Sequence, residues 1–503
     1  MLMMASTASC KATLRRFVTT TYRRLSTETM TYWNPKPNKS RRLLLKQSGA
    51  VGLGWLSASL VSAEVSEQST SGVASLDTEW IGRITDSEIR SGVQAAVFKN
   101  LLPAATQRVY AGHFTINADG GGFGNDTTWP GLDSWQMIGP YLRLGRKQMV
   151  EDYFDFVRAS QRNDGNIPFA IFSGNTPPGG CLRGLKVPND QFTYAPPKRD
   201  GLPETSHQTR RWVGLFEHWQ TKGNPLSTLA PVCYLLTASE TFAASGSLSW
   251  LNARIDSIES AALYLLTLRQ DNGLIGGSGF YIEAPPREGC DGVTQCYCVH
   301  AFRQLAGLFQ AWDDPKKAAI WSDHADGISK AMTEIFWRND HFAEYLHPQR
   351  GLVDSLGLSD VNWAAVAFEL ASPSQLENLW PLLMNSPEFW AGDMPTQSVT
   401  KPSTYEPWEF SRSSDCNAVD PLNDVAAMGR VWYLEALACR RMQENQRLVD
   451  SVRKVCRAAQ EGYWRERYHV KSDGTVSADG SLKYCEYPAV LLRVVLDNFA
   501  LFV

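Results

Sequence analysis

The segment RQDNGLI at residues 269–275 directly follows apolar residues that recur at helical spacing over 255–268. Related sequences occur at three other places: RNDGNIP at 162–168, WRNDHF at 337–342 and WRERY at 464–468. Each places a polar or glycine-containing turn after a helix, followed by a short apolar segment that could be extended. The pattern therefore predicts a helical unit that is repeated along the chain.

The repeats predict pairs of helices over most of the chain. We place these pairs at 86–162, 225–270, 292–337, 361–384 and 423–462, with a last helix near 487–501. Units that cannot bury their own apolar faces must stack, either in an open solenoid or in a closed ring. The repeats are too divergent and their loops too long for tetratricopeptide or HEAT arrays. We therefore predict an all-α fold, an (α/α)6 toroid with long loops forming a site at one end.

Two long segments between the predicted helices are expected to cover this site. Residues 171–224 and 385–422 contain Gly, Pro, Tyr and Trp with little periodicity. Loops of this length without secondary structure of their own are usually functional in compact domains.

The N-terminal region is typical of an export signal. SRRLLLKQSG at 40–49 precedes an apolar run at 50–60 and the small residues 61–63, as in twin-arginine signals. A basic helix end before a buried helix is the structural alternative, and the Arg-rich, acid-poor residues 1–29 also resemble a mitochondrial transit peptide. We predict a leader at 1–63, a linker at 64–84, a catalytic domain at 85–503, and a periplasmic or secreted protein.

The charge balance argues against nucleic acid as a partner. The whole chain has a net charge of −3, and its first 63 residues hold ten Lys or Arg against the single acid Glu28, so the remainder carries −12. Phosphate neutralisation supplies much of the affinity for nucleic acid, and an acidic surface opposes it. Beyond residue 65 no apolar run is long enough for a membrane span, and we expect no integral span in the mature chain.

Missing signatures exclude several classes of enzyme. The sequence has no GxSxG elbow, phosphate-binding P-loop, paired-glycine dinucleotide motif or HExxH pair. It also lacks Cys or His at zinc spacing and the ligand spacing of an EF-hand, so we predict neither a metal nor a cofactor.

The chain does hold 17 Trp, 17 Tyr and 21 Phe, many of them in polar loops beside acids. Rings stack on sugar faces while carboxylates bind hydroxyl groups, so this mixture favours a carbohydrate site.

Three segments combine acids with aromatic residues. They are TWPGLDSWQ at 128–136, FYIEAPPREGCDGVTQ at 280–295 and YCEYP at 484–488. The acids Asp133 and Asp291 each precede a predicted helix and could simply cap it. An acid held among rings, as Glu486 is in the third segment, tends to have a perturbed pKa, which is useful in catalysis.

These segments resemble the motifs of glycoside hydrolase families 63 and 37, the α-glucosidase and trehalase relatives, which are six-hairpin enzymes. EGCD at 288–291 resembles the ESG(W/M)D motif around their general acid, and Glu486 in CEYP is similar to the late motif that carries their general base. Residues 130–136 resemble an early substrate-binding segment, and DGNIP at 164–168 resembles the sequence that follows it. Cys290, Gly292 and the missing Asn after Glu486 depart from the pattern. Glucoamylase, rhamnosidase and debranching-type families share the architecture with different acid positions.

The resemblance implies an inverting glycoside hydrolase acting on an oligosaccharide, with an α linkage expected. Asp291 would protonate the leaving oxygen, and Glu486 would deprotonate a water on the opposite face of the sugar. The predicted substrate-binding residues are Asp133, Trp135, Trp129, Arg287, Gln295, Trp408, Glu409 and Tyr487, with Glu406 and Glu409 as reserve carboxylates.

Other functions stay open at this point. A non-catalytic glycan-binding toroid, in which the acids are helix caps, would place Asp291 and Glu486 far apart or facing away from any cleft. A glycan phosphorylase or an unsaturated-uronyl hydrolase could use the same barrel, and the phosphorylase would need basic and hydroxyl groups beside the acid.

Overall fold

The computed structural model divides into two compact units, Met1–Ser59 and Leu60–Val503, and all the residues it describes belong to the second. Those residues are 78–110, 113–116, 127–131, 134–173, 192–195, 215–218, 227–277, 287–392, 394–401, 406–410, 426–470 and 475–503. The predicted leader at 1–63, Asp133 and large parts of the two long segments lie outside them.

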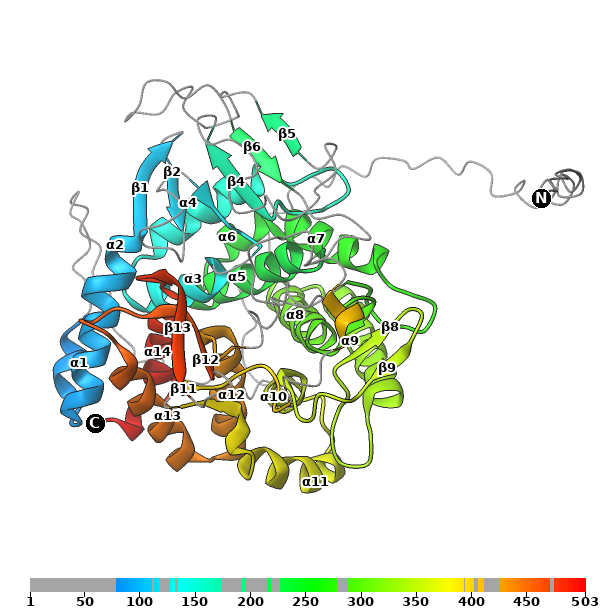
Figure 1. The fold of residues 1–503 in the computed structure, drawn as a ribbon. Coiled ribbons are helices and arrows are strands. Elements are labelled where there is room, and N and C mark those ends of the chain that lie inside the picture. Colours follow the sequence, from blue (N-terminus) through cyan, green and yellow to red (C-terminus); the bar gives the residue numbers. More distant parts are fainter. Residues whose placement is uncertain are drawn as a thin grey trace, which may run out of the picture. The chain divides into compact units, whose positions relative to one another are not determined.

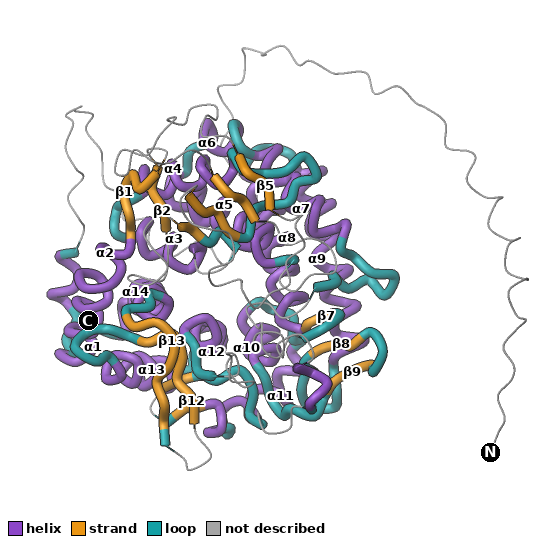
Figure 2. The backbone as a smooth tube through the Cα atoms, turned by 45° about the horizontal axis from the view of Figure 1, so that its top comes forward, coloured by secondary structure: helices purple, strands orange, loops and turns teal. Residues whose placement is uncertain are grey.

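Six helices among the described residues form a closed inner ring (Figures 1 and 2). Each packs against the next in chain order, and the last packs against the first. They are α3 (Ser134–Arg143), α5 (Leu229–Ser245), α8 (Gly292–Ala311), α10 (Asp360–Ala367), α12 (Gly429–Met442) and α14 (Glu486–Asp497). Helices α5 and α10 are buried along most of their length, as expected for helices covered on more than one side.

A second set of helices completes the hairpins outside this ring. They are α1 (Ser87–Ala95), α4 (Lys147–Arg158), α7 (Ile255–Thr267), α9 (Pro315–Phe336), α11 (Pro373–Met384) and α13 (Asn445–Ala458). The short α2 (Leu102–Ala104) and α6 (Leu248–Asn252) lie between the longer helices in the chain. Helix α1 packs against both α13 and α14, so the two ends of the described chain complete one hairpin. The predicted all-α (α/α)6 toroid is confirmed.

The repeated sequence seen at 269–275 forms a similar turn after several outer helices. Gly165 and Gly273 both have positive φ, 90° and 86°. The backbone then folds back: Gln270 N donates to Leu274 O at 2.8 Å, and Arg162 N donates to Asn166 O at 3.0 Å. A Cβ at residue 165 would overlap the carbonyl oxygen of Ser260. Glycine is required there both by its φ angle and by this close approach. The predicted copy at 464–468 differs, because its residues from Arg465 onward form a strand and the turn precedes it.

The strands form small antiparallel sheets between the helices. A three-stranded sheet contains β7 (Cys290–Asp291), β8 (Tyr345–His347) and β9 (Gly351–Val353), with Asp291 opposite Tyr345. A four-stranded sheet contains β3 (Thr127–Thr128), β4 (Ala170–Ser173), β6 (Leu215–His218) and β5 (Phe192–Ala195) in that order. Three hairpins pair β1 (Ala105–Tyr110) with β2 (His113–Ile116), β10 (Trp390–Ala391) with β11 (Met394–Pro395), and β12 (Arg465–Val470) with β13 (Val476–Leu482).

The packed structure begins before the predicted end of the linker at residue 84. Residues Glu79–Arg83 form a 3-10 helix, and Ile81 and Ile84 are buried in the core. Thr85 N donates to the carbonyl of Phe502 at 2.9 Å, which ties this segment to the C-terminus. Residues 79–85 therefore pack with the domain, and the predicted bounds of leader, linker and catalytic domain stay a prediction.

No helix among the described residues has both the length and the apolar character needed to cross a membrane. The seven cysteines in the same part of the chain are all buried.

Candidate active site

The ionisable residues of the candidate site lie where inner helices begin. Asp291 precedes the first residue of α8, whereas Asp360 and Glu486 are the first residues of α10 and α14. In each hairpin the outer helix returns the chain, so successive inner helices start at the same end of the ring. The start of a helix carries partial positive charge, which stabilises a nearby carboxylate.

Arg287 is fully buried and binds three carboxyl groups. Its Nη1 lies 3.1 Å from Asp291 Oδ1 and 2.9 Å from Asp360 Oδ1, and its Nε is paired with Glu344 Oε1. All four side chains are at most 4% accessible. We call these four residues the Arg287 cluster. One guanidinium cannot neutralise three ionised carboxylates, and buried excess charge is costly.

Asp291 both caps a helix and binds the arginine. Its Oδ2 accepts a hydrogen bond from Thr294 N at 2.7 Å, while Oδ1 faces Arg287. Gly292, the next residue, donates its N–H to the carbonyl of Glu344 at 2.9 Å, and a Cβ there would lie 2.9 Å from that oxygen. The cap role that the sequence left open is therefore present, together with a charged contact that a simple cap would not need.

Asp360 has a raised pKa, about 6 in the folded protein. Burial is the main cause, and the charge of Asp291 adds to it, whereas Arg287 acts in the opposite direction. Its backbone N–H donates to Ser398 O at 2.7 Å, which fixes the start of α10 against the segment 394–401. A buried carboxyl group with such a pKa can hold a proton at mildly acidic pH.

Glu486 is the first residue of α14, and its side chain also contacts the start of α12. Its Oε1 accepts a hydrogen bond from Arg430 N, and its Oε2 lies 3.2 Å from Arg430 Nη1. A Cβ at Gly429 would come within 3.0 Å of Glu486 Cγ, so only glycine leaves room for the side chain. The helix start and the guanidinium both stabilise a negative carboxylate, as a general base requires.

Two features connect the Arg287 cluster with Glu486. Burial raises the pKa of the Tyr297 hydroxyl, and Asp360 and Glu486 are both among the nearby charges that raise it further. The segment 394–401 also passes from one site to the other: Gln397 pairs with Ala427 just before α12, and Pro395 O accepts from Tyr487 Oη at 3.1 Å. Asp291 and Glu486 stand at the starts of α8 and α14, which are not adjacent in the ring; α10, with Asp360, and α12, with Arg430, lie between them.

A further buried acid, Glu409, lies beside the Arg287 cluster. Glu409, one of the reserve carboxylates, accepts a hydrogen bond from the hydroxyl of Tyr345, and its other oxygen accepts from Glu406 N at 2.7 Å. Burial, followed by Glu409, raises the pKa of Tyr345. Trp408 is half-buried, with the guanidinium of Arg350 4.3 Å from its ring centroid. This side of the site combines a ring, a hydroxyl group and carboxylates.

Three other predicted binding residues are packed inside the protein. Trp129 and Tyr487 are buried, and Trp129 makes an edge contact with Phe169. Gln295 uses its side-chain amide on the backbone of Ile275, donating at 2.9 Å and accepting at 2.8 Å. Their contact with a substrate stays a prediction.

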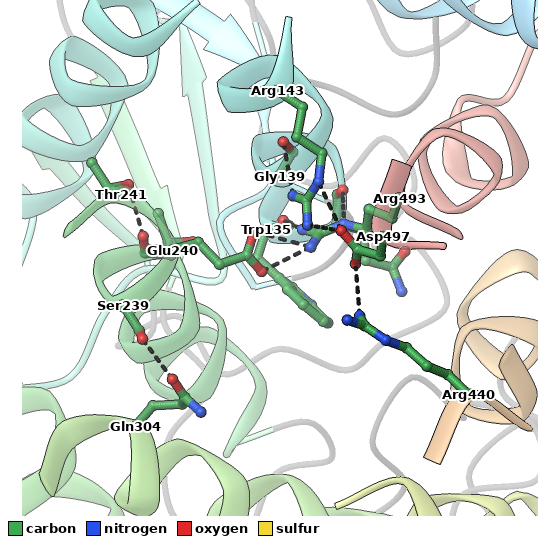
Figure 3. A network of polar contacts seen from close by, with 12 residues as sticks. Trp135, Gly139, Arg143, Ser239, Glu240, Thr241, Gln304, Arg440, Arg493 and Asp497 are labelled. Carbon is green, nitrogen blue, oxygen red and sulfur yellow. Dashed lines mark hydrogen bonds and ion pairs between the residues drawn. The ribbon is translucent and has the colours of Figure 1, made fainter. Parts of the chain in front are cut away.

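Trp135 lies in a separate polar network around Arg493 (Figure 3). Arg493 Nε donates to the carbonyl of Gln136 at 2.8 Å, and its Nη2 donates to the carbonyl of Trp135. Pro140 has no N–H, so it leaves Gln136 O without its usual partner within α3. The remaining guanidinium nitrogen, Nη1, contacts both oxygens of Glu240, at 2.8 and 3.0 Å. The Trp135 ring packs under this guanidinium and against Tyr297 and Tyr433.

Sequence reasoning missed Glu344, Asp360 and Arg430. Glu344 follows the turn at 337–342 by two residues, and Asp360 and Arg430 stand in the first turns of α10 and α12. The usable signal was their position in the repeat, because charged residues at the starts of successive inner helices meet at one end of the ring. Among the described residues no group of three or more His, Cys, Asp or Glu is arranged to hold a metal ion.

No protein-family model matches the sequence, and no curated protein is similar to it in sequence. Three solved structures are similar in fold. A glycoside hydrolase family 78 rhamnosidase of a Bacillus species has 11% identity and a TM-score of 0.50, over 82% of this chain and 35% of that one. A Klebsiella oxytoca rhamnosidase with rhamnose bound has 10% identity and a TM-score of 0.52, over 83% and 64%. A family 63 mannosylglycerate hydrolase from Thermus thermophilus, in complex with glucose, has 11% identity and a TM-score of 0.52, over 80% and 98%.

This chain thus spans about a third of the first rhamnosidase, under two thirds of the second, and nearly the whole length of the mannosylglycerate hydrolase. At 10–11% identity these likenesses show the fold, which is that of the six-hairpin glycoside hydrolases.

Proposed function

We propose that this protein is an inverting glycoside hydrolase that cleaves an oligosaccharide, with an α linkage expected. The observation that carries the proposal is the pair of buried acid sites at neighbouring helix starts, the Arg287 cluster and Glu486 with Arg430. The fold, shared with glycoside hydrolases, agrees with it.

In this reaction the glycosidic carbon–oxygen bond breaks as the leaving oxygen takes a proton from a carboxyl group of the Arg287 cluster. The oxygen of a water molecule bonds to the anomeric carbon, and Glu486 takes the proton that this water gives up. The motif resemblance assigns the acid role to Asp291. The two products together contain one added water.

The charges of the site argue against a phosphorylase. In an inverting phosphorylase the phosphate would take the place of the water beside Glu486, where it would meet that carboxylate, which is already paired with Arg430. The Arg287 cluster and Glu409 add further carboxyl groups to the proposed site. Water, being neutral, is the more favourable nucleophile in such surroundings.

The test is hydrolysis of a panel of α- and β-linked oligosaccharides, with the first-formed anomer of the product identified by NMR. We expect Glu486→Gln to lower kcat/KM by about 10²- to 10⁴-fold, the usual contribution of a general base. Glu377→Gln, an exposed change on the outer helix α11, serves as the matched control and should keep wild-type activity. Retention of configuration, or full activity in Glu486→Gln, would contradict the proposal.

We also propose export through the twin-arginine signal at 40–49. Replacing Arg41 and Arg42 with Lys should retain the protein inside the cell, as measured by fractionation.

A further inference from the structure

The segment 394–401, which we call the strap, is paired with the chain just before two inner helices. It forms an antiparallel bridge from Val399 to Ser359, the residue before α10, and another from Gln397 to Ala427, two residues before α12. All but its last two residues are buried. The strap therefore joins the starts of α10 and α12 inside the protein.

The strap also contacts both acid sites of the proposed hydrolase through its backbone. The N–H of Asp360 donates to Ser398 O at 2.7 Å. The hydroxyl of Tyr487, whose neighbour in the chain is Glu486, donates to Pro395 O at 3.1 Å. Because these contacts lie close together on one short segment, the strap fixes the two helix starts relative to each other.

One side chain anchors the strap to the helices. The hydroxyl of Thr396, which is fully buried, donates to Glu435 Oε2. Glu435 lies in α12 and is itself buried, and its Oε1 accepts a hydrogen bond from Arg447 Nε in α13 at 2.6 Å. Both oxygens of this carboxylate are thus bonded, one to the strap and the other to a cation, and charge-assisted bonds of this kind are strong.

The arginine of this anchor is in contact with two aromatic rings. The guanidinium carbon of Arg447 lies 5.2 Å from the ring centroid of Trp363 in α10 and 5.3 Å from that of Trp390 in β10. Contacts between a cation and a ring are attractive and help to hold the side chain in place. Strand β10 pairs with β11, which is the beginning of the strap. The pair of Arg447 with Glu435 therefore joins three helices and the chain that enters the strap.

We propose that Thr396, Glu435 and Arg447 are positioning residues of the hydrolysis. They anchor the strap, and the strap sets the separation between the Arg287 cluster and Glu486. The inference rests on the proposed function, because an inverting enzyme needs its acid and base roughly 6.5–9.5 Å apart, with room for a water molecule. A misplacement of about 1 Å, caused by a change far from the chemistry, can lower a rate about 10²-fold.

Thr396→Val tests the anchor, because it removes the hydroxyl group and keeps the shape of the side chain. We expect kcat on the oligosaccharide to fall about 10- to 100-fold, with KM within roughly twofold of wild type. Thr396→Ser keeps the hydroxyl and should restore most of the activity. The matched control is Thr241→Val in α5, which removes a buried hydroxyl bonded to Thr237 O at 2.7 Å. It should lower the melting temperature and leave kcat unchanged.

A merely structural role of the anchor predicts a different result. Thr396→Val would then lower the melting temperature as Thr241→Val does, while kcat well below that temperature would equal the wild-type value. This result would overturn the proposal, and so would a Thr396→Ser enzyme as slow as Thr396→Val. If Thr396→Val does not fold, Thr396→Ala removes the same hydroxyl and takes its place in the comparison.

Hydrogen exchange followed by mass spectrometry tests the strap without any substrate. Three amide groups pair the strap with the chain at the start of α10. They are Asp360 N, Thr400 N and Lys401 N. Peptides containing these amides should exchange roughly fivefold faster in Thr396→Val, because a lost hydrogen bond lowers the local free energy of opening. In Thr241→Val they should exchange as in wild type.

The exchange result separates this inference from the proposed function. Unchanged exchange in Thr396→Val would overturn the inference, whatever the activity of the enzyme. Faster exchange, in a protein whose wild type cleaves no glycoside, would support the anchored strap and count against the hydrolase function alone.

Discussion

Arg287 and Arg493 are both buried arginines in the hairpin toroid, yet their surroundings differ. Arg493 pairs with one carboxylate, Glu240, and its other donors bind the neutral carbonyls of Trp135 and Gln136. Burial tends to lower the pKa of Arg493, but Glu240 and other groups raise it overall. Arg287 instead binds three carboxyl groups. The first arrangement is balanced in charge, and the second is not.

The difference separates a structural site from a chemical one. A balanced buried pair has no reason to exchange protons, and the Arg493 network closes the ring by joining α14 to α3 and α5. Around Arg287, burial raises the pKa of Asp360 to about 6, so ionising this carboxyl group in the folded protein costs stability. Such costs are common at functional sites.

The largest expected effect follows from removing each arginine. Arg287→Met would leave three buried carboxyl groups without the cation they share, and we expect the free energy of unfolding to fall by about 3–5 kcal/mol near neutral pH. The loss should shrink at acidic pH, because the carboxyl groups can then neutralise by binding protons. Arg493→Met should cost about 3 kcal/mol, since breaking a buried pair is costly but Glu240 is partly accessible.

Urea unfolding of both variants at acidic and neutral pH measures this contrast. The Arg493→Met loss should depend less on pH, because it leaves one carboxylate that is already 26% accessible. Equal pH dependence in the two variants would show that the two arginines do not differ in the way proposed.

The second effect is a gain in stability from Asp360→Asn. Since the pKa of Asp360 rises from 3.8 in the unfolded chain to about 6 when folded, the folded state binds the proton more tightly. Wild-type stability therefore falls as pH rises from about 4 to about 6, and it stays lower above that range. Because ionising this carboxyl group is costly in the folded state, we expect Asp360→Asn to be more stable than wild type at neutral pH, by about 1–3 kcal/mol.

Asp86→Asn provides the control of opposite sign. Burial tends to raise the pKa of Asp86, but hydrogen bonds from Arg453 and from the start of α1 lower it overall. Its charge therefore stabilises the fold above its unfolded pKa, and this contribution is lost as pH falls through the folded value. Thermal melting across the pH range should show Asp86→Asn less stable than wild type at neutral pH. An Asp360→Asn variant that behaves in the same way would refute the charge-excess argument.

The fold could be predicted from the sequence because its signals are local. The stripe at 255–268 and the turn at 269–275 report a helix and its end without any tertiary contact, and the same turn recurs with Gly165. A closed ring was preferred to an open solenoid because the repeats are divergent and their loops long. Ile81 and Ile84, by contrast, belong to a short 3-10 segment and its end, which present no periodic face in the sequence.

The candidate site was only partly predictable. Asp291 and Glu486 were singled out because they stand in motifs that resemble known ones, whereas Glu344 and Asp360 reach Arg287 from other parts of the chain. No spacing along the chain reveals that contact. The sugar contact of Trp135 stays a prediction, and the contact of its ring with Arg493, which lies in the last inner helix, could not be read from the sequence.

The smallest effect concerns the glycine that lets Arg493 reach α3. A Cβ at Gly139 would overlap the guanidinium of Arg493, and the guanidinium cannot move without losing its bonds to Glu240 and two carbonyls. We expect Gly139→Ala to lower the free energy of unfolding by about 1–3 kcal/mol, as overpacking usually does.

Gly307, inside the inner helix α8, provides the control, because no atom lies within 4 Å of the position that a Cβ would take there. Gly307→Ala should therefore be neutral or stabilising by about 0.5–1 kcal/mol through helix propensity. Urea unfolding of the two variants decides the matter: if Gly139→Ala is as harmless as Gly307→Ala, Arg493 is not held tightly, and its contrast with Arg287 is one of charge alone.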